Sequence, residues 1–370
     1  AKTKAELAST TPVTIQVERV VGKVAVAALD AAIADLNANG LKETIDDKED
    51  VKLEFVLTGW EVLQNNESRL IKNIDATGWT ITNWNALNLQ RSYWAKDYTT
   101  AGRTSYLVED LSGEDGEFKY VEETVNQTAT AQSALNSVSP YLLVSGKFVD
   151  ASTKQAVDLV EWRGQKYTKE GYLNLIAGME SVSQYYTATT VDGVTKYTSF
   201  TADLLELVDN DGNDWGATAQ LKDESTQFYT VTFKADGKTV DEATPAAIAN
   251  VKAAIAEFKE VMYWNGGNTY YFVPIKHQAK DADTNFYGVV RNHVYQMNIT
   301  KINGYGTPVA DPNDAIDEPE KPVRDDTYMN AEVVILDWRV IVNEDVTLGN
   351  GKELIKLLII EGTVFTGDKK

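Results

Sequence analysis

Residues 286–302 read Phe-Tyr-Gly-Val-Val-Arg-Asn-His-Val-Tyr-Gln-Met-Asn-Ile-Thr-Lys-Ile, a run rich in β-branched and aromatic side chains. Because such side chains pack well on a pleated surface, the run predicts a β-strand. Comparable runs bounded by glycine, asparagine or aspartate predict further strands at residues 13–17, 20–26, 51–63, 141–148, 157–162, 228–233 and 269–275. The chain is therefore expected to be mainly β.

Two stretches carry helical periodicity instead of alternation. Residues 27–39 are rich in alanine and stop before Gly40. The second stretch begins with Thr244 as N-cap and Pro245 in the first turn, followed by an apolar stripe that extends to Met262. Residues 85–130 match neither period and are expected to form long loops.

The composition excludes several classes of function. The 370 residues include 55 acidic and 35 basic side chains, so the formal net charge is -20. A surface this acidic repels nucleic acid and anionic lipid, and no apolar stretch is long enough to span a membrane. The sequence has no cysteine and two histidines, His277 and His293, so thiol chemistry is excluded and a histidine-based metal site is disfavoured. We expect no cofactor and no enzymatic activity.

The order of segments near the C-terminus suggests three parts. Residues 307–327 hold half of the prolines of the chain among many acidic residues, a composition typical of a solvated, extended tether. This divides the chain into a β-sandwich body at residues 1–306, the tether at 307–327, and detached C-terminal strands at 328–370.

The segment after the tether needs a partner sheet. Its even positions form an apolar row that begins with Val334, Leu336, Trp338, Val340 and Val342. Residues 354–360, Leu-Ile-Lys-Leu-Leu-Ile-Ile, are apolar on both faces and read as a fully buried strand. Such strands either complete the sheet of their own body or enter a neighbouring subunit by donor-strand complementation, and the residues alone leave both options open.

Several of these stretches resemble one known family. Residues 287–306, which contain Arg291, Asn292, His293 and Tyr295, and the tryptophan-bearing strand at 329–342 are similar to segments of the fimbrillins, the major fimbrial subunits of type V pili of Bacteroidales. Residues 17–24 resemble the strand that opens the second domain of these pilins. Only a short segment precedes that strand here, whereas family members carry a complete domain before it.

The resemblance implies a transthyretin-like antiparallel β-sandwich and a role in a surface filament. Family members are exported as lipoproteins, and an arginine-specific protease removes a leading strand. The groove left behind accepts the C-terminal strand of another subunit. By this resemblance, Val334, Leu336, Trp338, Val340 and Val342 would be the donor residues, and other pilin copies would be the partners. The expected location is the outer surface of the cell, with a host glycan or protein as a further partner.

The chain contains a few patterns that carry chemistry in other proteins. Asp209, Asp211 and Asp214 surround Gly212 and form the strongest metal candidate, although the pattern lacks the spacing of an EF-hand and an acidic turn is favoured. Adjacent carboxylate pairs, such as Glu122–Glu123, are interpreted as solvated surface rather than the acid and base of a glycosidase. His293 alternates with Tyr295 along its strand, which favours a structural histidine over a ligand or base.

An aromatic cluster supports a competing function. Planar rings on loops can stack on sugars, and the region predicted to be loops contains Trp79, Trp84, Tyr93, Trp94 and Tyr98. The rings can instead pack the long loops onto the sandwich, and this reading is favoured. The sequence therefore favours a structural pilin that assembles by strand exchange. Its alternative is a secreted glycan-binding adhesin module that completes its own sheet.

Overall fold

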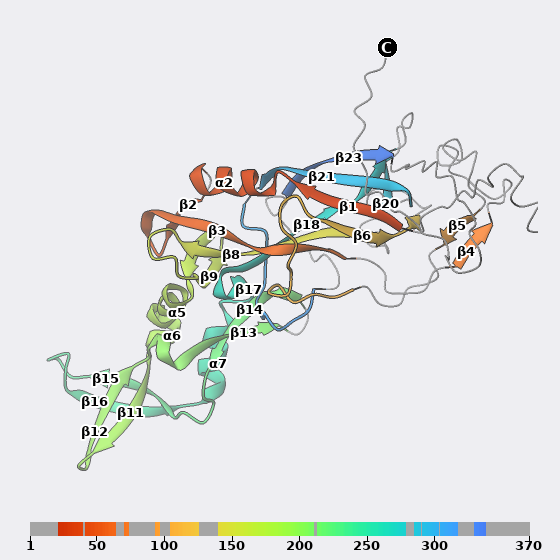
Figure 1. Cartoon of the computed structure of the whole chain (residues 1–370). Coiled ribbons are helices and arrows are strands. Elements are labelled where there is room, and N and C mark those ends of the chain that lie inside the picture. The colour runs from red at the N-terminus through yellow and green to blue at the C-terminus, as the bar shows by residue number, and fades with distance from the viewer. Residues whose placement is uncertain are drawn as a thin grey trace, which may run out of the picture.

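Figure 1 shows the computed structural model, in which a strand-rich body carries a projecting β-arm. The structure describes residues 21–39, 41–63, 70–73, 93–96, 104–125, 140–210, 213–278, 285–289, 291–302, 304–316 and 329–337. Strands dominate these residues and most of them pair in antiparallel fashion, so the prediction of a mainly β fold is confirmed. The strand predicted at residues 13–17 lies outside the described residues.

One layer of the body is a four-stranded sheet. Its order is β23 (Met329–Asp337), β21 (His293–Ile302), β1 (Val21–Ala27) and β6 (Phe118–Glu122). β1 and β21 run parallel, with Val24 opposite Tyr295, whereas the two outer pairs are antiparallel. Val24 and Val26 of β1 are buried and their odd-numbered neighbours are not, as the alternation of the sequence predicts.

The other layer belongs to a ten-stranded sheet. In spatial order its strands are β13 (Leu205–Asn210), β14 (Asn213–Leu221), β17 (Val261–Trp264), β9 (Leu159–Trp162), β10 (Gln165–Thr168), β2 (Lys42–Ile45), β3 (Lys48–Leu63), β8 (Tyr141–Asp150), β18 (Asn268–Pro274) and β22 (Thr307–Pro308). Strands β3, β8, β9 and β18 confirm predicted strands to within a few residues.

The main core lies between these two layers. Tyr295 and Met297 of β21 pack in one apolar cluster with Phe55 of β3 and Tyr271 of β18. All four side chains are almost completely buried, and the ring of Phe55 lies edge-on to that of Tyr271 at 5.8 Å. Burial of large apolar side chains from both layers is what holds the sandwich together.

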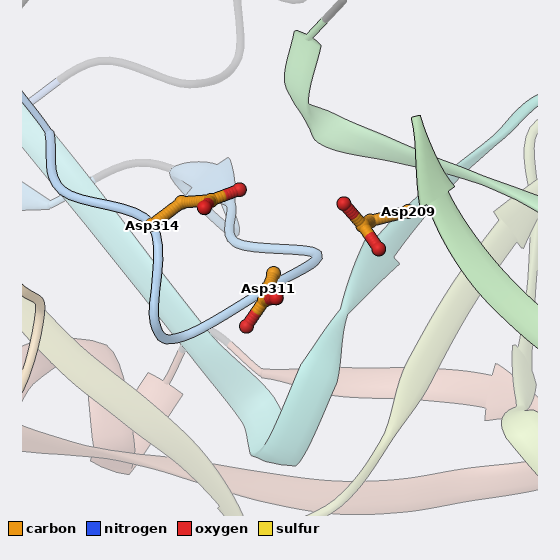
Figure 2. A group of neighbouring side chains, drawn as sticks. All are labelled: Asp209, Asp311 and Asp314. Atoms are coloured by element: carbon orange, nitrogen blue, oxygen red, sulfur yellow. The ribbon is translucent and has the colours of Figure 1, made fainter. Parts of the chain in front are cut away.

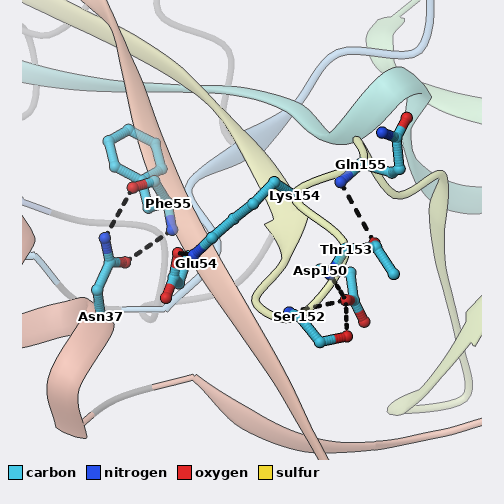
Figure 3. Close-up of polar contacts among 8 residues, drawn as sticks. All are labelled: Asn37, Glu54, Phe55, Asp150, Ser152, Thr153, Lys154 and Gln155. Carbon is cyan, nitrogen blue, oxygen red and sulfur yellow. Dashed lines mark hydrogen bonds and ion pairs between the residues drawn. The ribbon is translucent and has the colours of Figure 1, made fainter.

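Helix α2 (Leu29–Asn39) covers one end of this core and confirms the first predicted helix. Its Asn37 side chain replaces a missing strand neighbour: Nδ2 donates to the Phe55 carbonyl at 2.9 Å, and Oδ1 accepts from the Phe55 amide at 2.7 Å. Figure 3 shows this clip beside the turn at Asp150, whose carboxylate accepts hydrogen bonds from Ser152 and Thr153. Both arrangements satisfy backbone groups that the sheet leaves open.

The second predicted helix begins later than expected. Thr244 and Pro245 belong to strand β16 (Val240–Ala246), α7 spans Ile248–Ala256, and Met262 lies in strand β17. The described residues also contain α5 (Lys169–Gly178) and α6 (Glu180–Ser183), together with short 3-10 turns η1 (Ala202–Leu204) and η2 (Asn265–Gly267). Both predicted helices are therefore present, and α5 and α6 are two further short helices that the sequence did not predict.

The quoted run at 286–302 is two strands rather than one. β20 (Asn285–Val289) joins a small sheet with β19 (Lys276–Gln278) and β7 (Thr124–Val125), and a turn at Arg291 and Asn292 separates it from β21. Asn292 has φ of 61°, a left-handed conformation that asparagine tolerates better than most residues.

The region predicted as long loops also contains strands. β5 (Tyr93–Lys96) pairs with β4 (Leu70–Asn73), and β6 and β7 lie between residues 118 and 125.

The predicted tether is corrected over its first half. Val309 and Ile316 pack against the outer face of β8 and β18 and are at most 2% exposed. β22 also pairs with β18. Ile316 and Tyr106 exchange backbone hydrogen bonds of 2.9 and 3.1 Å. Residues 307–316 are thus part of the body, because apolar residues among the prolines anchor them. Residues 317–327 lie outside the described part of the chain.

The projecting arm is a separate four-stranded antiparallel sheet (Figure 1). Its order is β12 (Val194–Ser199), β11 (Tyr185–Val191), β15 (Phe228–Phe233) and β16. β15 has the bounds predicted from the sequence.

Candidate functional site

The edge of the four-stranded sheet brings together the two segments that the sequence singled out. β23 pairs along β21 over the whole length of that strand, with Val334 opposite Gln296 and Leu336 opposite Val294. The C-terminal strand is therefore not detached in this chain, since it completes the sheet as an edge strand. Of the five predicted donor residues, Trp338, Val340 and Val342 lie outside the described residues.

The turn before β21 is anchored by a buried ion pair. The Arg291 Nε and the Glu123 Oε2 are 3.6 Å apart, and the two side chains are 6% and 0% exposed. The backbone amide of Arg291 also donates to Glu123 Oε1 at 3.2 Å. Glu123 follows β6 directly, so the pair ties the far edge strand of the sheet to the start of β21. The interpretation of Glu123 as solvated surface was wrong.

The two residues that follow Arg291 fix the direction of β21. The amide of Asn292 donates to the Val21 carbonyl at 3.2 Å, which links the turn to the start of β1. His293 Nδ1 lies 2.9 Å from the Arg291 carbonyl oxygen, and since a carbonyl only accepts, this nitrogen carries the proton. Tyr295, the fourth motif residue, is fully buried. The motif residues thus form a structural corner at the head of the strand that accepts β23.

An acidic cluster lies elsewhere, beside the β13–β14 hairpin. Figure 2 shows Asp209 facing Asp311 and Asp314, and one carboxylate oxygen of each lies within 4.8 Å of the others. Of the predicted trio, Asp211 lies outside the described residues and the side chain of Asp214 is not described. Carboxylate oxygens suit a hard cation such as Ca²⁺, but exposed acidic groups often cluster without one.

The sequence could not indicate this cluster, because Asp311 and Asp314 fall in the predicted tether, about a hundred residues after Asp209. They come together because residues 307–316 return to the body. Asp311 already accepts hydrogen bonds from the backbone and side-chain nitrogens of Asn313, at 2.9 and 2.7 Å. The arrangement is that of an acidic turn packed beside a hairpin.

The structure describes only two of the five aromatic residues that were candidates for sugar binding. Tyr93 and Trp94 belong to β5, although their side chains are not described, and Trp79, Trp84 and Tyr98 lie outside the described residues.

Among the described residues, no helix is long and apolar enough to cross a membrane. No match to a curated protein was found. Residues 262–344 match the family model described as major fimbrial subunit protein type IV, fimbrillin, C-terminal. The matched range begins at β17 and includes β21, the motif residues at its head, and the whole of β23. The match supports a fimbrillin-type protein, and the family it names consists of structural subunits of fimbriae.

Proposed function

We propose that this chain polymerises into a fimbria by exchange of its C-terminal strand between subunits. In the polymer, the strand that begins as β23 leaves its own body and pairs with β21 of a neighbouring copy. The observation that carries the proposal is the position of β23, which lies at the edge of its sheet and, within the described part of the chain, pairs with β21 alone.

An edge strand can be exchanged without breaking any other strand pair. When β23 leaves, the pairing of β21 with β1 and of β1 with β6 is retained. The vacated edge of β21 then presents open backbone donors and acceptors, which are a template for another strand. An identical strand from a second copy restores the same register of nine residue pairs, so the pairing is equivalent in cis and in trans.

The chain is long enough to allow the exchange. The body is anchored up to Ile316 and β23 begins at Met329, so twelve residues connect them. An extended segment of this length spans up to about 40 Å, enough to direct β23 away from its own sheet. The acidic composition of this connection disfavours its burial and keeps it in solvent.

The donor strand continues beyond β23 in this proposal. Val334 and Leu336 occupy β23, and Trp338, Val340 and Val342 extend the same apolar parity. By register, Val334 and Leu336 share the half-buried face of Gln296 and Val294, whereas Val333 and Ile335 lie opposite the buried Met297 and Tyr295. The five predicted donor side chains would therefore cover the outer face of the neighbouring sheet, while their odd-numbered neighbours would face its core. The role requires no catalytic residue and no cofactor, and its partners are copies of this chain or related subunits.

The absence of cysteine from the sequence permits a clean test by disulfide formation. One preparation carries Gln296→Cys and the other carries Val334→Cys, at positions that lie directly opposite each other. The two preparations are mixed during assembly and oxidised. A covalent heterodimer on a non-reducing gel is expected if the strand is exchanged. If only the double variant of a single chain forms the disulfide, the strand remains in cis and the proposal is wrong.

A second variant tests the predicted donor residues. Trp338→Asp should prevent polymer formation, seen by size exclusion and negative-stain imaging, while the circular dichroism of the monomer is retained. A monomer that no longer folds would place Trp338 in its own body.

A further inference from the structure

The projecting arm presents one apolar face that has no cover among the described residues. The register pairs Tyr186 with Tyr229 and Ala188 with Tyr197, and residues directly opposite each other share a face. Alternation along the strands adds further members. The apolar ones, which we name the arm aromatic face, are Tyr186, Ala188, Tyr197, Tyr229, Val231, Phe233, Ala243 and Pro245, and Thr190, Thr195 and Ser199 lie on the same side. This set contains no charged residue.

The opposite face attaches the arm to the body. Tyr185 and Phe228 lie on that face at the root of the arm, are buried, and belong to the second apolar core of the body. Toward the tip the same face carries threonines, Lys196, Glu242 and the exposed pair Val191 and Val194. No residue of the arm aromatic face belongs to any buried cluster, and Phe233 is 40% exposed.

A sheet with one apolar and one polar face normally packs its apolar face on another element. Among the described elements, none outside the arm makes extensive contact with its four strands. An uncovered apolar face of this kind marks an interaction surface. The remaining question is which partner covers it.

The geometry of the rings argues against a sugar. Tyr197 and Tyr229 lie 5.5 Å apart with their planes at 78°, and Tyr186 and Phe233 lie 5.8 Å apart at 65°. Rings that stand edge-on to one another form no coplanar platform on which a pyranose ring could stack. Apolar side chains, which need contact area rather than a flat surface, fit such a face better.

The chain itself contains an apolar segment that lies outside the described residues. Residues 354–360 are apolar at six of seven positions, and they follow β23 by 17 residues. That connection reaches up to about 55 Å when extended. Figure 1 shows β23 and the arm at opposite ends of the described molecule, separated by the body. After the proposed exchange, β23 and the tail of the donor lie at the β21 edge of the acceptor, so copies arranged in line would bring that edge toward the arm of the next copy.

We propose that residues 354–360 of one subunit pack on the arm aromatic face of another copy. This inference rests on the proposed strand exchange and adds a second contact to it. A strand that is apolar on both faces can pack one face on the arm and turn the other toward apolar side chains of the adjoining subunit. The contact explains why the arm has an apolar face at all.

Disulfide mapping again separates the possibilities. One preparation carries Val231→Cys on the arm aromatic face, and the other carries Leu358→Cys or Ile359→Cys, so that both faces of the tail strand are sampled. The matched control is Thr232→Cys, the adjacent residue on the polar face. After mixed assembly and oxidation, the heterodimer should form several-fold more with Val231→Cys than with Thr232→Cys. Equal yields, or no product, would overturn the inference.

The exchange pair at positions 296 and 334 is measured in parallel. If that pair links two chains and the 231 pair does not, the arm contact fails while strand exchange stands. If neither pair links two chains, the proposed function itself fails. A disulfide that forms only within one chain, in the double variant, would place the tail on its own arm and overturn the inference. If the 231 pair forms no cross-link and Tyr229→Ser abolishes binding of the protein to a glycan array, the face binds a sugar and the inference is wrong.

Discussion

Removal of either partner of the Arg291–Glu123 ion pair should destabilise the protein strongly. At the Nε–Oε2 distance of 3.6 Å, the attraction between unit charges is about 5 kcal/mol for an effective dielectric constant of about 20. Both side chains are almost completely buried, so a single substitution leaves the other charge buried without this partner. We expect Arg291→Met and Glu123→Gln each to lower the free energy of unfolding by about 3–5 kcal/mol.

The double variant should recover most of this loss. Neither position 123 nor position 291 then carries a charge, and the glutamine amide oxygen can still accept the hydrogen bond from the backbone amide of residue 291. We expect it to unfold within about 1–2 kcal/mol of the parent protein, since a buried ion pair contributes little net stability relative to neutral replacements. The coupling free energy of the double-mutant cycle is then large.

Urea unfolding of monomeric protein, followed by tryptophan fluorescence, measures all four free energies. The matched control is the exposed pair of Lys252 and Glu224, whose side chains are 50% and 64% exposed although their atoms are only 2.5 Å apart. Glu224→Gln should change stability by at most about 0.5 kcal/mol. Losses below about 1 kcal/mol for both buried single variants, or additive losses in the double variant, would refute the reasoning.

Three further outcomes follow from local hydrogen bonds. Thr168→Ala removes the side-chain cap on the Gly171 amide at the start of α5 and should cost about 1 kcal/mol in urea unfolding, whereas Thr168→Ser should cost much less. Asn37→Ala opens the backbone of Phe55 in β3 and should cost about 1–3 kcal/mol, while Asn39→Ala, which loses only an exposed contact with Asp35, should be nearly neutral. Hydrogen bonds from Ser152 and Thr153 lower the pKa of Asp150 to about 2 from its ordinary 3.8, so its stabilising contribution is present above pH 4 and is lost as the pH falls toward 2. Carboxyl NMR titration should give that pKa, and Ser152→Ala should move it back toward 3.8; an unchanged value in the variant would contradict the assignment.

Strands were predictable from the sequence where alternation was strong and the ends were marked by turn residues. β15 has its predicted bounds, and β3 extends the predicted range by three residues. The helix expected to begin at Thr244 begins at Ile248 instead, because its capping signals, a threonine followed by a proline, also suit an edge strand. Pro245 lies in β16, at the edge of the arm, where the missing amide hydrogen costs no ladder bond.

Other elements were not predicted because their sequence signals, although local, were weak. α5 has Thr168 as its cap and buries Tyr172, Leu173 and Ile176 at helical spacing, but glycines in its first turn and at its end obscure the pattern. Position 171 requires a glycine for another reason, since a Cβ there would lie 1.7 Å from the Asp46 carboxylate. Such a reason is visible only when the fold is known.

Long-range contacts were beyond any local pattern. Glu123 looked like one of many surface acids, and its burial depends on Arg291, which lies far away in the sequence. The approach of Asp311 and Asp314 to Asp209 likewise depends on the return of residues 307–316 to the outer face of the sandwich. The motif residues at 291–295 and the first two donor residues were found from the resemblance, and their common location on one sheet edge follows from the fold.

The parallel pairing of β1 with β21 also constrains when this protein can fold. The centre of the four-stranded sheet can form only when Val24 pairs with Tyr295, which lies roughly 270 residues later in the chain. Such non-local pairing makes folding slow. A chain that emerges from a membrane N-terminus first therefore cannot close its main core until β21 has followed. β23 then follows β21, and it arrives at a sheet whose edge has only just been built. A late, open edge of this kind gives a strand from a subunit that is already assembled the opportunity to bind first.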